Sequence, residues 1–370
     1  MHVLHIFNEI NFSGAEMMYA NAAGLFQEKG IKMTAMGTGM NSGNFVQQFE
    51  KAGVTIIQRP FPKGFKTPLF VVRYMRALYR YIKKEEVEVL HVHRSDVFLY
   101  FSIAAALAGK KTIMTPHNVF RNRVFTWPKA WLERMSARRL FRTTFQTIGE
   151  SVYNNELNYY KNPSVRINNW YNAARFFPAL QGEKALSRSR LGIANDAFVV
   201  VSTGSCSEVK NHGDIIKAVA LVNKEFSCIY LHLGSGHLEA DEKILAEKLN
   251  AAGNIRFLGN KENVRDYLIA SDVFVMPSRF EGLSIAAIEA MACALPSILY
   301  NSPGLTDLIK DDDNGFLIEH DPALIAEKIV LLKNNPAMAA QKGKNAFDFV
   351  STNFDMTTSV DQIIRLYGNK

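Results

Sequence analysis

The sequence is poor in cysteine and contains no long apolar run. Three cysteines occur among 370 residues, Cys206, Cys228 and Cys293, and no C-x-x-C pair is present. An odd number of widely spaced cysteines argues against a disulfide framework and a zinc site, and it fits a reducing compartment. The longest apolar stretch, residues 97–108, falls short of the roughly 20 residues that a membrane-spanning helix needs. No secretory leader is visible, so we expect a cytoplasmic protein.

Several other patterns are missing. The sequence has no G-x-G-x-x-G motif, no internal repeat at a solenoid period and no low-complexity tract. Its 48% hydrophobic and 21% charged residues are ordinary for a globular protein. Because 370 residues exceed what one hydrophobic core usually supports, two domains are expected.

Short apolar or β-branched runs alternate with longer amphipathic runs, which is typical of parallel sheets covered by helices on both faces. The pattern predicts an α/β protein with domains 1–174 and 175–354. A closing helical segment, 355–370, is expected to pack back on the first domain. The expected strands are Val3–Phe7, Lys32–Met36, Val54–Gln58, Val89–His93, Thr112–Thr115 and Thr144–Ile148, followed by Phe198–Thr203, Ile229–Leu233, Ile255–Leu258, Val273–Met276 and Ser297–Tyr300.

Two strand ends carry candidate anion-binding loops. Ser13-Gly14 follows the first strand and precedes a helix, so the amide of Gly14 is a candidate phosphate donor; a plain helix-capping turn fits equally well. In the second half, Gly204-Ser205 follows a strand, and Lys210 stands just before a helix. A lysine at that place either reaches a diphosphate or is a solvated surface residue.

The stretch RFEGLSIAAIEAM, residues 279–291, places Glu281 at the end of a strand and Glu289 inside an apolar helix. Gly282 lets the backbone approach a ligand closely. The helix begins near Ser284, and the outward amides belong to Leu283, Ser284 and Ile285.

A carboxylate in apolar surroundings is costly unless it accepts hydrogen bonds, and the two hydroxyls of a ribose are suitable donors. A nucleotide diphosphate lying over the helix start would bring its ribose close to Glu289. The group attached to the diphosphate would then lie close to Glu281. The alternative is that Glu289 pairs with an arginine and that Glu281 is a surface loop residue.

These motifs resemble the retaining glycosyltransferases of family four, which have the GT-B architecture of two facing Rossmann-like domains. The resemblance covers nearly the whole chain. It rests on the E-x7-E motif in FEGLSIAAIEAMACALP, on S-E-V-K-N-H at 207–212, on Gly234-Ser235-Gly236, on Thr115-Pro116-His117-Asn118 and on Ser13-Gly14-Ala15-Glu16.

The resemblance implies a role for each matching residue. It assigns the nucleotide ribose to Glu289, the donor sugar hydroxyls to Glu281, the diphosphate to Lys210, a phosphate to the Gly14 amide, and the region between donor sugar and acceptor to His117. His93 has less support, and a structural histidine at a strand end remains the alternative for His117.

Two departures from the family pattern stand out. The family commonly has Gly-Arg where this chain has Gly204-Ser205, so one diphosphate cation is missing; Ser205 still offers a hydrogen bond, and Arg279 or a residue of the first domain is left to supply charge. The usual two-glycine loop of the first domain is Ser13-Gly14 here.

The implied reaction moves a sugar, preferably from a UDP-sugar, to a hydroxyl of a glycan or lipid-linked glycan with retention, as in bacterial-type surface polysaccharide synthesis. Neither a metal nor another cofactor is expected to be required. A sugar-nucleotide epimerase and a non-catalytic sugar-nucleotide binder are the alternatives. A nucleic-acid partner is not expected, because no DNA- or RNA-binding motif is present.

Charge is unevenly distributed between the two halves. Residues 1–180 hold 24 Lys and Arg against 11 Asp and Glu, a net of +13, whereas residues 181–370 hold 19 against 24, a net of −5. Basic residues at helical spacing between 73 and 84, and the stretch 121–131 with two tryptophans, suit docking on an anionic membrane at its inner face. A solvated basic face over buried aromatics is the alternative.

Overall fold

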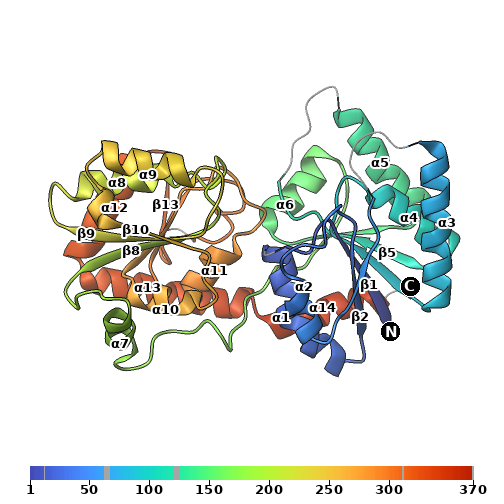
Figure 1. The fold of residues 1–370 in the computed structure, drawn as a ribbon, viewed down its shortest axis with the longest axis horizontal. Helices are drawn as coiled ribbons and strands as arrows, with labels where there is room; N and C mark the ends of the chain where they lie inside the picture. Colours follow the sequence, from blue (N-terminus) through green and yellow to red (C-terminus); the bar gives the residue numbers. More distant parts are fainter. Residues whose placement is uncertain (12, 62–66, 120–125, 311, 369–370) are drawn as a thin grey trace. The chain divides into compact units, whose positions relative to one another are not determined.

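The computed structural model describes residues 1–11, 13–61, 67–119, 126–310 and 312–368. The chain forms two compact units, Met1–Trp170 with Met356–Lys370, and Tyr171–Asp355. Each unit is a parallel sheet with helices on both faces (Figure 1). Among the helices in these ranges, none combines the length and the apolar character that a membrane crossing requires.

The first unit is built on a seven-stranded sheet of order β3-β2-β1-β4-β5-β6-β7, in which every pairing is parallel. All six strands predicted in this half are present within one residue at each end. β7 is short and exposed, and the sequence pattern did not predict it. The strands are β1 His2–Phe7, β2 Lys32–Gly37, β3 Thr55–Gln58, β4 Val89–Val92, β5 Lys111–Met114, β6 Thr144–Thr147 and β7 Val165–Arg166.

Helices α3, α4 and α5 cover one face of this sheet and form a core with β1, β4 and β6 that includes Leu4, Leu90, Phe101 and Phe145. Helices α1 and α14 pack together on the other face (Figure 1). The helices are α1 Gly14–Glu28, α2 Val46–Lys51, α3 Pro68–Lys84, α4 Phe98–Leu107, α5 Trp127–Leu140, α6 Glu150–Asn154, which continues into a π-helical turn Asn155–Tyr159, and α14 Met356–Gly368.

The closing helix α14 belongs to the first unit although it follows the second unit in the sequence. Tyr367 lies in the core, and its hydroxyl is 2.7 Å from Nδ1 of His91 on β4. The ammonium group of Lys111 donates to the carbonyl oxygen of Leu366, and Lys29 on α1 forms a 2.6 Å ion pair with Asp361. Helix α14 is therefore an integral layer of the first unit.

The second unit contains a six-stranded parallel sheet of order β10-β9-β8-β11-β12-β13. Every residue of β8, β11 and β12 is buried, as expected for central strands covered on both faces. The five predicted strands are present, and β13 was not predicted. The strands are β8 Phe198–Thr203, β9 Cys228–Leu233, β10 Ile255–Gly259, β11 Val273–Met276, β12 Ser297–Tyr300 and β13 Phe316–Ile318.

Helices α8, α9 and α12 lie on one face of this sheet, and α10, α11 and α13 lie on the other (Figure 1). Capping residues fix several starts: Ser284 begins α11, and Asp321 followed by proline begins α12. The helices are α7 Glu183–Arg190, α8 Gly213–Val222, α9 Glu239–Lys248, a 3₁₀ turn Ala252–Asn254, α10 Val264–Ala270, α11 Ile285–Ala292, α12 Pro322–Asn334 and α13 Pro336–Asn353.

Candidate functional site

The loops at the carboxyl edge of the second sheet pack backbone against backbone. A Cβ atom on Gly234, whose φ is +136°, would lie 1.8 Å from the carbonyl oxygen of Gly204, and one on Gly236 would lie 2.4 Å from that of Cys206. The amide of Gly204 donates to the carbonyl of Leu233 at 2.9 Å. Glycine is required at these positions, because any side chain would separate the loop after β8 from the loop after β9.

The loop between β11 and α11 is held by a third glycine. Gly304 has a φ of +80°, and a Cβ atom there would lie 2.6 Å from the carbonyl oxygen of Glu281. The amide of Glu281 donates to the carbonyl of Pro303 at 2.9 Å. These contacts fix Glu281 and Gly282 immediately before the N-terminus of α11, where parallel α/β sheets bind anionic ligands.

The start of α11 differs in one detail from the expectation. Leu283 and Ser284 are buried, and the Ser284 side chain caps the helix by accepting from the amide of Ala287 at 3.3 Å. The same hydroxyl lies 3.0 Å from Sδ of Met276. The Ser284 side chain therefore makes its hydrogen bonds within the protein and is not available to a ligand. The first-turn amides of Ile285 and Ala286 are the ones left without a partner inside the helix.

Lys210 and Glu281, which are 71 residues apart in the sequence, form an ion pair with 2.6 Å between Nζ and Oε1. Their side chains are 21% and 13% exposed, so neither is a freely solvated surface group. Gly204 makes room for the lysine, since a Cβ atom there would lie 3.3 Å from its Cδ and Cε atoms. The fold thus brings together a cation suited to a diphosphate and a carboxylate suited to sugar hydroxyls.

Two further residues lie beside this pair. The hydroxyl of Ser205 is exposed and lies 3.4 Å from that of Ser207. Arg279 is exposed, and its amide donates to the carbonyl of Val209 at 2.8 Å, which joins the loop after β11 to the loop that carries Lys210. The backbone of Arg279, one of the candidates for the missing charge, is therefore held against the loop that carries Lys210.

Glu289 is the most unusual charged residue of the second unit. Its side chain is buried on α11, and in the part of the chain that the structure describes no hydrogen bond or ion pair reaches its carboxylate. Burial raises the pKa of Glu289 to about 8, and Arg175 opposes this shift only partly. Among the described residues no arginine forms an ion pair with Glu289, although Arg175 favours its charged form electrostatically.

In the first unit, Gly14 begins α1 directly after the loop that follows β1. Ser13 is the N-cap residue, and its hydroxyl donates to the carboxylate of Glu16, which is buried with a raised pKa. The Ser13 side chain thus bonds to Glu16 and makes no capping hydrogen bond to the helix backbone, while Gly14 is exposed at the carboxyl edge of the first sheet.

His117 is the end of a chain of three hydrogen-bonded histidines. Its Nε2 lies 2.9 Å from Nδ1 of His93, whose Nε2 lies 3.1 Å from Nδ1 of His5. Burial lowers the pKa of His117 to about 4 and that of His5 to about 3, so these imidazoles are neutral at pH 7. The chain fixes the orientation of the His117 ring. His5 was not among the predicted residues; the H-V-H spacing of β4 is the only sequence signal for such a chain.

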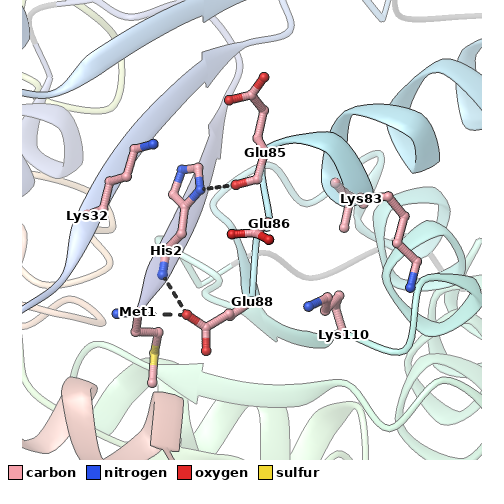
Figure 2. A pocket seen from close by; sticks show the side chains of 9 residues that line it. Met1, His2, Lys32, Lys83, Glu85, Glu86, Glu88 and Lys110 are labelled. Carbon is pink, nitrogen blue, oxygen red and sulfur yellow. Dashed lines mark hydrogen bonds and ion pairs between the residues drawn. The ribbon is translucent and has the colours of Figure 1, made fainter.

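A hollow at the opposite, amino edge of the first sheet is lined mostly by charged residues (Figure 2). Part of this lining is bonded within the protein: the amide of His2 donates to Oε1 of Glu88 at 3.0 Å, and Nδ1 of His2 lies 2.8 Å from the carbonyl of Glu85. Open parallel α/β sheets bind their ligands at the carboxyl ends of the strands. This hollow lies at the amino ends, so we do not take it as the substrate site.

Comparison with known proteins agrees with this fold. The family model "Glycosyltransferase Family 4" matches residues 12–175, and "Glycosyl transferases group 1" matches residues 183–349. The fold and these matches define a glycosyltransferase with the GT-B architecture. The chain belongs to glycosyltransferase family four.

Several relatives cover most of the chain. It is 26% identical to the putative glycosyltransferase EpsD of Bacillus subtilis over 93% of this chain and 90% of that protein. It is 28% identical to the UDP-Gal:alpha-D-GlcNAc-diphosphoundecaprenol alpha-1,3-galactosyltransferase of Escherichia coli over 79% of this chain and 78% of that protein. The structure of Anabaena Alr3699/HepE in complex with UDP matches the fold with a TM-score of 0.85 at 17% identity, over 100% of both chains.

Proposed function

We propose that this glycosyltransferase moves a sugar from a UDP-sugar to a hydroxyl of a lipid-linked glycan, with retention at the anomeric carbon, in bacterial-type surface polysaccharide synthesis. The observation that carries the proposal is the buried, unpartnered carboxylate of Glu289 on the helix whose start holds the Lys210–Glu281 pair. The donor and acceptor named for the Escherichia coli relative, UDP-galactose and a diphosphoundecaprenol-linked sugar, support the same choice for this chain.

In this proposal the donor lies over the start of α11. The ribose hydroxyls donate to Glu289, and the diphosphate accepts from Lys210, from the first-turn amides of α11 and from the Ser205 hydroxyl. Glu281 exchanges its contact with Lys210 for hydroxyls of the sugar. In the first unit, the Gly14 amide binds a phosphate, and the neutral ring of His117 faces the sugar and the acceptor.

Transfer begins as the bond between the anomeric carbon and the diphosphate oxygen breaks, which leaves negative charge on the diphosphate. Lys210 and the amides stabilise that charge. Because these groups are in position before the reaction begins, little reorganisation of the protein is needed. The acceptor oxygen then attacks the same face that the diphosphate leaves, and its proton passes to the departing phosphate oxygen. Charge stabilisation comes from groups of the chain, so no metal is needed at the diphosphate.

The donor class can be tested by thermal unfolding with a panel of UDP- and GDP-sugars. A ligand that binds only the folded protein raises its stability by about 2.7 kcal/mol at 100 times its Kd. We expect UDP-sugars to raise the Tm and GDP-sugars to leave it unchanged.

The best donor is then incubated with and without a diphospholipid-linked sugar, and the anomeric configuration of the product is read by NMR. We expect an α-linked product from an α-linked donor, formed only when acceptor is present. Inversion, an isomerised donor in the absence of acceptor, or binding without transfer to any acceptor would each contradict the proposal.

We further propose that the acceptor is reached on an anionic membrane surface through helix α3. Its aromatic residues Phe70, Tyr74 and Tyr81 pack into the core, but Leu69 and Val72 are 59% and 63% exposed. The exposed basic residues on the same stripe are Arg73, Arg76, Arg80 and Lys83. Exposed apolar side chains among cations suit a lipid interface.

The stretch 121–131, which was also predicted to face the membrane, contributes less to this proposal. Residues 120–125 lie outside the described part of the chain. Trp127 stacks on Trp131 with 6.2 Å between ring centroids, and its Nε1 donates to the carbonyl of Tyr159 at 3.0 Å, so it is tied into the protein. The test therefore concentrates on α3.

The triple variant Arg73→Glu, Arg76→Glu and Arg80→Glu is expected to lower the partitioning onto phosphatidylglycerol-containing liposomes by about 10²-fold, since each basic residue near such a surface contributes about 1 kcal/mol. Sedimentation at low salt measures it. A matched triple Lys→Glu variant of exposed lysines in the second unit, at Lys224, Lys248 and Lys344, serves as the control. Equal partitioning of the two variants, or of the unmodified protein on neutral and anionic liposomes, would exclude α3 as the docking helix.

A further inference from the structure

A cluster of metal-ligand side chains lies buried beneath the loops of the second unit. It consists of a thiol, two imidazoles and a carboxylate, all less than 10% exposed, and each comes from a different part of the fold. The members are Cys206 in the loop after β8, His212 at the N-cap of α8, His232 on β9 and Glu242 on α9.

Three of the four measured distances within the cluster fit a tetrahedral shell, and the fourth, 2.9 Å between the two imidazole nitrogens, is shorter. Sγ of Cys206 is 3.8 Å from Nε2 of His232, and that nitrogen is 2.9 Å from Nδ1 of His212. The Glu242 carboxylate lies 3.5 Å from His212 Nδ1 and 3.6 Å from His232 Nε2. Four ligands at zinc bond lengths of about 2.0–2.3 Å stand about 3.3–3.8 Å apart at tetrahedral angles.

Hydrogen bonding satisfies the cluster only in part, although the two imidazoles bond to each other and the Glu242 carboxylate interacts with His212 and Cys206. Oε2 of Glu242 and Nδ1 of His232 are buried and have no hydrogen-bond partner in the described part of the chain. The contacts of the carboxylate with both imidazoles are longer than the about 3.2 Å that an N–H···O bond allows. A buried carboxylate oxygen without a partner is costly, and a cation at the centre of the four ligand atoms would remove that cost.

We propose that Cys206, His212, His232 and Glu242 bind a Zn²⁺ ion in a closed, four-coordinate structural site. The ligand set selects the ion, because one thiolate and two imidazoles suit zinc, whereas Mg²⁺ and Ca²⁺ take oxygen ligands. With four protein ligands and no open position, the ion has no place for substrate. It is separate from the transfer chemistry proposed above.

The site has a defined mechanical role. Cys206 follows Ser205 directly, and His212 stands two residues after Lys210, so two ligands bracket the loop proposed to hold the diphosphate. The other two ligands lie on β9 and α9, in the body of the unit. Zinc therefore anchors residues 205–212 to the sheet, alongside the backbone contacts of Gly234 and Gly236.

The cysteine pattern argued against a zinc site, because the three cysteines are widely spaced and form no C-x-x-C pair. Consecutive ligands are 6, 20 and 10 residues apart in the sequence, and the parallel pairing of β8 with β9 brings them together. Local spacing therefore carried no signal for this site.

The test uses full-length protein from which any polyhistidine tag has been removed. Metal analysis is expected to find about one zinc per chain, and Co²⁺ added to the stripped protein is expected to give the intense visible bands of tetrahedral cobalt with a thiolate charge-transfer band. Both measurements are independent of nucleotide binding and transfer, so they can fail or succeed apart from the proposed function.

Two variants with matched controls test the ligands. Cys206→Ser is expected to remove the thiolate band, and Glu242→Gln to weaken zinc binding by more than the about 10–100-fold that loss of an outer-shell partner costs. Cys228→Ser, at a buried cysteine outside the cluster, and Glu247→Gln, at an exposed position of α9, are expected to bind zinc normally.

The wild-type measurements keep the test decisive if a ligand variant fails to fold. Wild-type protein without zinc that gains no thermal stability from added Zn²⁺ would overturn the proposal. A cobalt spectrum that Cys206→Ser leaves unchanged, in protein with a native circular dichroism spectrum, would do the same.

Discussion

Replacing Lys210 with alanine is expected to lower kcat by about 10²–10³-fold, which is the usual cost of removing one preorganised group that stabilises charge in a transition state. Lys210 is held in place before the donor binds, by its 2.6 Å ion pair with Glu281 and by the space above Gly204. Its main contribution should therefore appear in kcat, with a smaller rise in KM. Steady-state kinetics with varied donor and saturating acceptor measures both constants.

Lys217→Ala is the matched control, because Lys217 is an exposed lysine on α8 that pairs with Asp214 at 2.8 Å. It is expected to keep wild-type kinetics. If Lys210→Ala lost only donor affinity and kept its kcat, Lys210 would bind the ground state and the transition state equally, and the proposed stabilisation of the departing diphosphate would be wrong.

Glu289→Gln is expected to make the free protein more stable while it weakens nucleotide binding. Burial raises the pKa of Glu289 to about 8. Because the folded state then holds a proton that the unfolded state has lost, wild-type stability falls as the pH rises from about 4.5 to 8. A glutamine has no such ionisation, so the variant should gain on the order of 2 kcal/mol at pH 8, after the cost of its buried amide.

Binding should change in the opposite direction. Two ribose hydroxyls that donate to a carboxylate contribute about 1.5–3 kcal/mol each, so Glu289→Gln should weaken UDP binding by about 10²-fold or more. Wild-type affinity should rise from pH 6.5 to 8.5 as the carboxylate ionises, and the variant should lack this rise. Urea unfolding and calorimetric titration of UDP measure the two effects.

The control is Glu327→Gln, at a glutamate of α12 whose side chain is 59% exposed. It should change neither the stability at pH 8 nor the affinity for UDP. A Glu289→Gln variant with wild-type UDP affinity, or with no gain in stability at pH 8, would show that this carboxylate is satisfied inside the protein and does not bind the ribose.

The sequence predicted the parts of the fold whose signal is local. Central strands such as Phe198–Thr203 and Val273–Met276 are continuous β-branched or apolar runs, and their observed bounds equal the predicted ones. Two short strands, Val165–Arg166 and Phe316–Ile318, were missed. The first has only two exposed residues, so it carries no hydrophobic pattern; its pairing with β6 defines it.

The candidate site was predictable only where its residues are close together in the sequence. Glu281 and Glu289 lie on one loop and helix, so their spacing is visible in the sequence. The pairing of Lys210 with Glu281 and the histidine chain from His5 to His117 join residues that only the strand order of each sheet brings together. Burial decides the protonation of Glu289 and His117, and no local pattern reveals it.

The place of helix α14 has a consequence for how the protein is made. A ribosome that has completed the first 170 residues has produced the strands of the first sheet and helices α1 to α6, but not the helix that packs on α1 and supplies Tyr367 to the core. The apolar surface that awaits this helix stays open while the whole second unit is synthesised. Completion of the first unit thus waits until the second unit has been synthesised, and a fragment ending at residue 170 would expose that surface permanently.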